Sequence, residues 1–285
     1  MEIIIVKPFG YCFGVNEALK ELLNIKNNNP NKKIYTLGTL IHNEEILNLY
    51  KNNDISVVDE SDLNQLECDS VVVFSAHGHA KKLEDILIKK NIKFYSTTCT
   101  YIKKIYDLID TFDESNCIYI GLKNHQEGKA ILNNYKNIIF YDLNEGILDK
   151  TIDLNKTYHL INQSTIDQET LIKINKILND KKIKIKPTNT TCDSLLVRYK
   201  NMMNLPINKE IYVLVVGSKT SNNANILLNI YQNRTKYSNC SLINSSEELK
   251  DINLKNINKI YLVSSTSSSL DQLNEIAKVI KETYN

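Results

Sequence analysis

The chain has 285 residues, of which 42% are hydrophobic and 24% charged, a composition typical of a globular protein with a buried core. Its 35 basic and 33 acidic residues leave a formal charge of +2 spread along the sequence, so no face for nucleic acid is expected. No apolar run approaches the roughly 18 residues that cross a bilayer, and Met1 to Lys7 lack the features of a secretory signal or transit peptide. We therefore expect a cytoplasmic protein that binds neither nucleic acid nor a membrane.

Strand-like and helix-like segments alternate along the chain, which predicts an α/β protein with mainly parallel sheets. The predicted strands are short, rich in β-branched residues and bounded by turn residues. They include Ile3 to Val6, Ser70 to Phe74, Cys117 to Ile120, Ile211 to Val216 and Ile260 to Val263. No linker rich in glycine, proline or serine divides the chain cleanly.

A strand, a turn, a cysteine and an amphipathic helix follow one another at three places. Cys12 follows the first predicted strand, and Cys99 and Cys192 repeat this arrangement at intervals of 87 and 93 residues. Apolar residues at helical spacing follow each of the three cysteines. The recurrence predicts three similar α/β lobes, each of which contributes one cysteine.

Three cysteines in this setting indicate a shared metal site. The positive end of the following helix favours a thiolate and also stabilises the negative charge of an iron–sulfur cluster. Zinc is the competing interpretation, although structural zinc sites usually contain Cys-x-x-Cys pairs, which this sequence lacks. A third interpretation is that the cysteines are small core residues, and we assign this role to Cys68, Cys117 and Cys240.

Several loops at predicted strand ends carry side chains that suit an anion. Three of them contain a histidine, namely His42, His77 and His125. His125 and Glu127 are two residues apart, so in a loop they can face one cavity as a hydrogen-bond relay and a proton donor. Hydroxyl and amide groups recur in Asn162 to Thr165, Gly217 to Asn225 and Val263 to Asp271. Such groups often only cap helices, but several loops of this kind together predict one small polyanionic ligand.

The ordered motifs resemble those of the 4-hydroxy-3-methylbut-2-enyl diphosphate reductase family, the LytB-type enzymes that end the non-mevalonate isoprenoid pathway. Each motif is short, but the set occurs in the family's order and covers nearly the whole chain. The matching stretches are Pro8 to Val15, Ile41 to Asn43, Ser75 to Gly78, Thr98-Cys99, His125-x-Glu127, Cys192, Gly217 to Lys219 and Ser268.

The resemblance implies three similar α/β lobes with mainly parallel sheets, arranged around a central iron–sulfur cluster. One [4Fe-4S] cluster per chain would be held by Cys12, Cys99 and Cys192. The amino-terminal strand would join the carboxyl-terminal lobe. The lobes implied in this way are residues 13–98, 99–191, and 1–12 together with 192–285.

The resemblance also implies the reaction, a reductive dehydroxylation of 4-hydroxy-3-methylbut-2-enyl diphosphate to isopentenyl and dimethylallyl diphosphate. The substrate hydroxyl would bind the iron that has no protein ligand, and Glu127 with His125 would supply the proton that lets it leave as water. The substrate-binding residues would be His42, His77, His125, Ser164, Thr165, Ser221, Asn222, Asn223 and Ser268. The sequence shows no flavin or nicotinamide fingerprint, so a ferredoxin or flavodoxin would deliver the electrons.

Some positions depart from the family pattern. Thr100 and Gln126 stand where prolines are usual, and Leu195 stands where a polar threonine is usual; further departures are Ser164 for threonine, Asn222 for serine and Leu270 for proline. They leave open a divergent member that reduces or dehydrates another hydroxylated substrate at the same cluster. A non-catalytic cluster-binding redox sensor is a third interpretation, against which the retained Glu127 counts.

Overall fold

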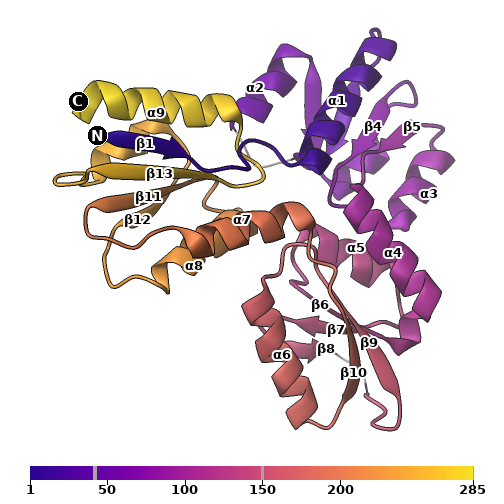
Figure 1. The fold of residues 1–285 in the computed structure, drawn as a ribbon. Helices are drawn as coiled ribbons and strands as arrows, with labels where there is room; N and C mark the ends of the chain where they lie inside the picture. Colours follow the sequence, from indigo (N-terminus) through magenta and orange to yellow (C-terminus); the bar gives the residue numbers. More distant parts are fainter. Residues whose placement is uncertain (41–43, 149–150, 285) are drawn as a thin grey trace. The chain divides into compact units, whose positions relative to one another are not determined.

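The structure is a computed structural model that describes residues 1–40, 44–148 and 151–284, and in it strands and helices alternate (Figure 1). The strands are β1 (Glu2–Ile5), β2 (Ile34–Leu37), β3 (Ile55–Val58), β4 (Val71–Phe74), β5 (Lys93–Ser96), β6 (Cys117–Gly121), β7 (Ile139–Asp142), β8 (Gly146–Leu148), β9 (Thr157–Asn162), β10 (Lys184–Thr188), β11 (Ile211–Val216), β12 (Cys240–Ile243) and β13 (Lys259–Ser264). The α-helices are α1 (Phe13–Asn28), α2 (Glu44–Asn52), α3 (Lys81–Lys89), α4 (Thr100–Phe112), α5 (Gln126–Asn134), α6 (Gln168–Asp180), α7 (Asp193–Asn204), α8 (Asn222–Gln232) and α9 (Leu270–Tyr284). Short 3-10 helices are η1 (Glu60–Gln65), η2 (Glu114–Asn116) and η3 (Ser246–Asp251).

The strands form three sheets, with the orders β3-β2-β4-β5, β10-β9-β6-β7-β8 and β1-β13-β11-β12. Among the described strands, every pair is parallel except β7 with β8. The inner strands β4 and β6 are buried along their whole length, which explains their nearly continuous apolar sequences. The predicted α/β class with mainly parallel sheets is confirmed.

The three sheets share one strand order. In the first sheet the strands, numbered along the chain, lie in the order second, first, third, fourth: β3-β2-β4-β5. Without the edge strand β8, the second sheet repeats this order as β7-β6-β9-β10, and the third repeats it as β12-β11-β13-β1 with β1 in the fourth place. The fourth place in the third sheet is taken by β1, which lies parallel to β13 with Glu2 opposite Lys259 (Figure 1). In each sheet the fourth strand is the one that leads to Cys12, Cys99 or Cys192.

The chain divides into two compact units. Unit 1 comprises Met1–Asn16, Ile41–Leu47 and Asp193–Asn285 and contains the sheet that ends in β1. Unit 2 comprises Glu17–Leu40 and Asn48–Cys192 and contains the other two sheets. Each of the three predicted lobes contains one sheet, but this division into two units does not test the lobe boundaries, which stay a prediction.

Apolar helix faces cover the sheets. In unit 1, Leu214 and Val216 of β11 share a core with Leu273 and Ile276 of α9, while α7 and α8 lie against the opposite face of the sheet (Figure 1). In unit 2, a core formed by β6, β7 and β9 with α4 and α5 includes the fully buried Tyr119. This core positions the residues of the candidate site.

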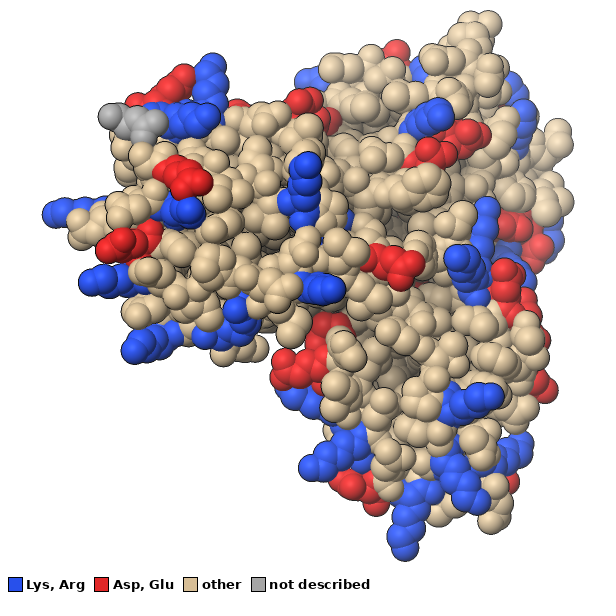
Figure 2. All heavy atoms as spheres, in the orientation of Figure 1, with Lys and Arg blue, Asp and Glu red and all other residues tan. Residues whose placement is uncertain are grey.

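The surface carries charges of both signs. Figure 2 shows basic and acidic side chains interspersed over the face in view. Within the described ranges, no helix combines the length and the apolar character that crossing a bilayer requires.

Candidate active site

The three cysteines predicted as metal ligands have the same local geometry. Each directly precedes the first residue of a helix, α1, α4 or α7, and each is partly exposed. The backbone N–H of each cysteine donates to the carbonyl of the residue two positions beyond the end of the neighbouring strand. These bonds are Cys12 to Thr266 after β13 (3.2 Å), Cys99 to Ala76 after β4 (3.0 Å) and Cys192 to Ser164 after β9 (2.9 Å). The recurrence predicted from the sequence therefore extends to individual hydrogen bonds.

The other cysteines differ from these three. Cys117 and Cys240 are buried, and burial raises the pKa of each thiol to about 12, so neither is a thiolate at neutral pH. Their assignment to the core is confirmed. The same assignment is wrong for Cys68, which is exposed because it lies in the polar turn between η1 and β4.

The predicted ligands are divided between the two units. Cys12 belongs to unit 1, and Cys99 and Cys192 belong to unit 2. Among the residues that the structure describes, no three histidine, cysteine, aspartate or glutamate side chains form a group that could hold a metal. The cluster and its ligand set therefore stay a prediction.

Glu127 is a fully buried carboxyl group in the first turn of α5. Its Oε1 accepts hydrogen bonds from the Tyr119 hydroxyl (2.8 Å) and the Ser164 N–H (2.9 Å), and its Oε2 accepts one from Ser164 Oγ (2.7 Å). Burial raises the pKa of Glu127 to about 7, although these donors oppose the shift. A carboxyl group that is partly protonated at neutral pH suits a general acid.

The structure brings together two of the predicted histidines. The rings of His77, after β4, and His125, after β6, meet edge to face with centroids 5.7 Å apart. His125 also caps α5, since its Nδ1 accepts the Glu127 N–H at 3.2 Å. His42 lies outside the described residues.

Ser164 links the predicted acid to a predicted ligand. Its N–H and hydroxyl bond to Glu127, and its carbonyl accepts the N–H of Cys192. The adjacent Thr165 accepts a hydrogen bond from Gln163 Nε2 at 2.7 Å. Contact of Ser164 and Thr165 with a substrate stays a prediction.

The remaining predicted substrate residues lie in unit 1, at the ends of the neighbouring strands β11 and β13. Ser221 caps α8 and Asn222 begins it, while the buried Asn223 donates to Thr266 Oγ1 at 3.3 Å. Ser268 is buried and donates to the Val216 carbonyl at 2.6 Å. Because Thr266 also accepts the N–H of Cys12, these residues border the loop that carries the first cysteine.

Arg198 has a role that the sequence did not reveal. The side chain is only 3% exposed, and its guanidinium donates to the carbonyls of Gly10 (2.7 Å) and Ser264 (3.3 Å). These bonds hold the loop before Cys12 against the end of β13. Leu195 lies one turn before Arg198 on α7 and is buried. The apolar residue that departs from the family pattern at this position is therefore accommodated in the core.

The Tyr119 hydroxyl and the strand-end carbonyls were likewise not predicted. Strand alternation places Tyr119 on the same side of β6 as Cys117 and Gly121. Nothing in the sequence indicates that its hydroxyl reaches Glu127.

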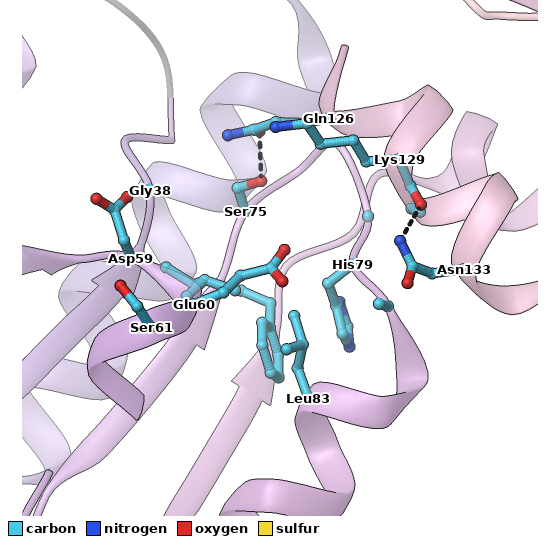
Figure 3. A pocket seen from close by; sticks show the side chains of 15 residues that line it. Gly38, Asp59, Glu60, Ser61, Ser75, His79, Leu83, Gln126, Lys129 and Asn133 are labelled. Atoms are coloured by element: carbon cyan, nitrogen blue, oxygen red, sulfur yellow. Dashed lines mark hydrogen bonds between the residues drawn. The ribbon is translucent and has the colours of Figure 1, made fainter. Parts of the chain in front are cut away.

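Gln126 connects two loops of unit 2 at the edge of a cavity of about 370 Å³ (Figure 3). Its Oε1 accepts a hydrogen bond from Ser75 Oγ at 3.2 Å, so the loop after β4 is tied to the start of α5. Asp59 and Glu60 line the cavity from η1 and its cap, and Lys129 lines it from α5. None of the predicted site residues is among its lining residues.

Comparisons with known proteins agree with these features. A family model described as "LytB protein" matches residues 3–281. A relative from Malacoplasma penetrans named 4-hydroxy-3-methylbut-2-enyl diphosphate reductase is 31% identical over 243 residues, covering 81% of each chain. A relative of the same name from Fusobacterium nucleatum is 26% identical over 291 aligned positions and covers all of this chain, which spans only 34% of that relative's length.

The fold matches a solved structure. The E-1-hydroxy-2-methyl-but-2-enyl-4-diphosphate reductase from Plasmodium falciparum superimposes with a TM-score of 0.83, at 23% identity, over 100% of this chain and 88% of the other. At this identity the likeness shows the fold alone. Together with the match over residues 3–281, it shows that the chain belongs to the LytB family.

Proposed function

We propose that the chain is a 4-hydroxy-3-methylbut-2-enyl diphosphate reductase that forms isopentenyl and dimethylallyl diphosphate. The observation that carries this proposal is the Glu127 site. A fully buried carboxyl group with a pKa near 7 lies at the start of α5, next to the paired rings of His77 and His125. Such a site can hold a proton for a leaving hydroxyl and donors for an anion.

The same proposal assigns one [4Fe-4S] cluster to Cys12, Cys99 and Cys192, which stand at the boundaries along the chain between the lobes 13–98, 99–191, and 1–12 with 192–285. The chain's residues fit the group, because all three thiols are partly exposed, precede helices and share one backbone hydrogen-bond pattern. When bound, the cluster would supply two electrons and a Lewis-acidic iron beside the substrate. An external donor of the ferredoxin or flavodoxin type would provide the electrons.

The diphosphate would lie among histidine, hydroxyl and amide donors. These donors are His42, His77, His125, Ser164, Thr165, Ser221, Asn222, Asn223 and Ser268. The first backbone N–H groups of α5 and α8, which follow the caps His125 and Ser221, would also favour an anion. Glu127 would give its proton to the departing hydroxyl, which leaves as water. A second proton would complete the product at carbon.

The cluster assignment is tested by anaerobic reconstitution of single variants. Changing Cys12, Cys99 or Cys192 to alanine should lower iron well below about four per chain and remove the broad absorbance near roughly 400 nm. The matched variants Cys117→Ala and Cys240→Ala should keep both. Equal iron contents in all five variants would contradict the ligand set.

The reaction is tested with the reconstituted protein, hydroxymethylbutenyl diphosphate and a low-potential reductant. The two five-carbon diphosphates are the expected products. Glu127→Gln should leave the cluster spectrum unchanged and lower the rate by about a hundredfold or more. An intact cluster without product would contradict the proposed reaction and favour another hydroxylated substrate.

A further inference from the structure

The two oxygens of Glu127 have different partners. Oε1 accepts two hydrogen bonds, from the Tyr119 hydroxyl and from the Ser164 backbone N–H. Among the residues that the structure describes, Oε2 accepts one bond, from Ser164 Oγ. The N–H can only donate, whereas the serine hydroxyl can donate or accept. The Tyr119 hydroxyl can also accept, but the carbonyl oxygen of a carboxylic acid is a better acceptor than its hydroxyl oxygen. Protonated Glu127 therefore keeps both bonds to Oε1 at full strength if the proton sits on Oε2 and the bond to Ser164 Oγ reverses.

We propose that Tyr119 is a positioning residue that makes Oε1 the carbonyl oxygen of protonated Glu127 and so directs the proton from Oε2 toward Ser164 Oγ. The inference rests on the proposed role of Glu127 as the acid. Without the tyrosine hydroxyl, Oε1 would accept only one hydrogen bond. The two oxygens would then compete for the proton on nearly equal terms.

Tyr119 is held firmly enough for this role. The residue is fully buried in the core of unit 2, and its ring packs against Phe140 with centroids 5.4 Å apart. A Cβ at Gly121 would lie 2.7 Å from Tyr119 Cε1, so glycine at that position leaves room for the ring. Burial raises the pKa of Tyr119 well above 10, so the hydroxyl keeps its proton and remains a donor.

In the described part of the chain, the groups that face Glu127 come from four places. Tyr119 faces it from β6, Ser164 from the loop after β9, Tyr106 from α4, and His125 from the cap of its own helix. Tyr106 offers a matched comparison, because it packs against the same core and its buried hydroxyl has no hydrogen-bond partner among the described residues. Phenylalanine at position 106 thus removes a hydroxyl from the same core without removing a donor to Glu127.

Infrared spectroscopy tests the inference without substrate. The carboxyl C=O band of Glu127 is identified in the resting holoenzyme near pH 6 as the band lost in Glu127→Gln. Tyr119→Phe should shift this band to higher frequency, because the carbonyl oxygen loses a donor, while Tyr106→Phe should leave it in place. A band that does not move in Tyr119→Phe would place the proton on the other oxygen and overturn the inference. The wild type provides a check that needs no variant at position 119. Its band should already lie at the low-frequency end of the range, as expected for a C=O group that accepts two hydrogen bonds.

Kinetics give a second readout if the reductase activity is present. Tyr119→Phe should lower kcat about tenfold, the scale of one hydrogen bond to an ionisable group, with KM changed less than twofold. The alkaline limit of kcat should move up by about one pH unit, because the carboxylate loses a donor. Tyr106→Phe should match the wild type. Unchanged kcat and pH profile in Tyr119→Phe would contradict the role, whereas absence of activity in every variant would contradict only the proposed function.

Discussion

Replacement of Glu127 by glutamine is expected to change the pH dependence of stability. The amide has the same shape as the protonated carboxyl and can keep its hydrogen bonds. Its oxygen can accept from the Tyr119 hydroxyl and the Ser164 N–H, and its NH₂ group can donate to Ser164 Oγ. The substitution therefore removes the ionisation of Glu127 and little else.

The size and sign of the effect follow from the pKa. Burial raises the pKa of Glu127 from its ordinary value of 4.5 to about 7. The contribution of Glu127 to stability is greatest below pH 4.5, where the group is protonated in both states. This contribution falls as the pH rises to 7, because the unfolded chain ionises first. Two and a half pH units correspond to about 3 kcal/mol. Glutamine avoids this loss, so the variant should exceed the wild type by about 1 kcal/mol at pH 5 and by about 3 kcal/mol at pH 8.

Anaerobic thermal unfolding of both holoproteins between pH 5 and 8 measures this difference. At roughly 2 °C per kcal/mol for a chain of this size, the gap in Tm should open to about 6 °C at pH 8. Effects of pH on the cluster are common to both proteins and cancel in the difference. Glu169→Gln, which changes an exposed carboxyl, should give a curve parallel to that of the wild type. A gap between Glu127→Gln and the wild type that stays constant from pH 5 to 8 would refute the reasoning.

Three further substitutions test the packing. Arg198→Lys removes the guanidinium that holds the loop before Cys12. It should lower the unfolding free energy by about 2 kcal/mol, measured by thermal unfolding, and should also lower the iron content of the reconstituted protein. Gly128→Ala places a Cβ 2.1 Å from a backbone carbonyl oxygen and should cost more than about 2 kcal/mol in urea unfolding, with a loss under 1 kcal/mol contradicting the geometry. Gln126→Pro should change the unfolding free energy by less than about 1 kcal/mol, because position 126 begins α5 and His125 before it is extended; a loss above about 2 kcal/mol would contradict this.

The fold class could be predicted because buried parallel strands and amphipathic helices leave clear patterns in the sequence. The position of Cys12, Cys99 and Cys192, each after a strand and a turn and just before a helix, could be predicted for the same reason. A strand, a turn and a helix start are local features of the sequence. The role of Arg198 could not, because its acceptors are carbonyls that belong to distant segments. Cys68 was misassigned because its short polar turn gave no sign of whether the thiol faces the core or the solvent.

In the candidate site, too, the sequence predicted local features but not the contacts between distant segments. The spacing of His125 and Glu127 predicted two polar groups in one loop, and the structure shows that one caps the helix while the other is buried beneath it. The hydrogen bond from Tyr119 to Glu127 could not be predicted, because a tyrosine in a strand normally indicates core packing. Only the depth at which α5 packs on β6 brings its hydroxyl to the carboxyl.

The pairing of β1 with β13 has a consequence for the synthesis of the protein. The amide of Cys12 bonds to the carbonyl of Thr266, 254 positions later in the chain. A chain growing on the ribosome therefore adds 254 residues after Cys12 before it makes the residue that anchors the Cys12 amide. The loop around Cys12 can take its final form only after residue 266 has left the exit tunnel, so of the three cysteines the first to be made is the last to be placed.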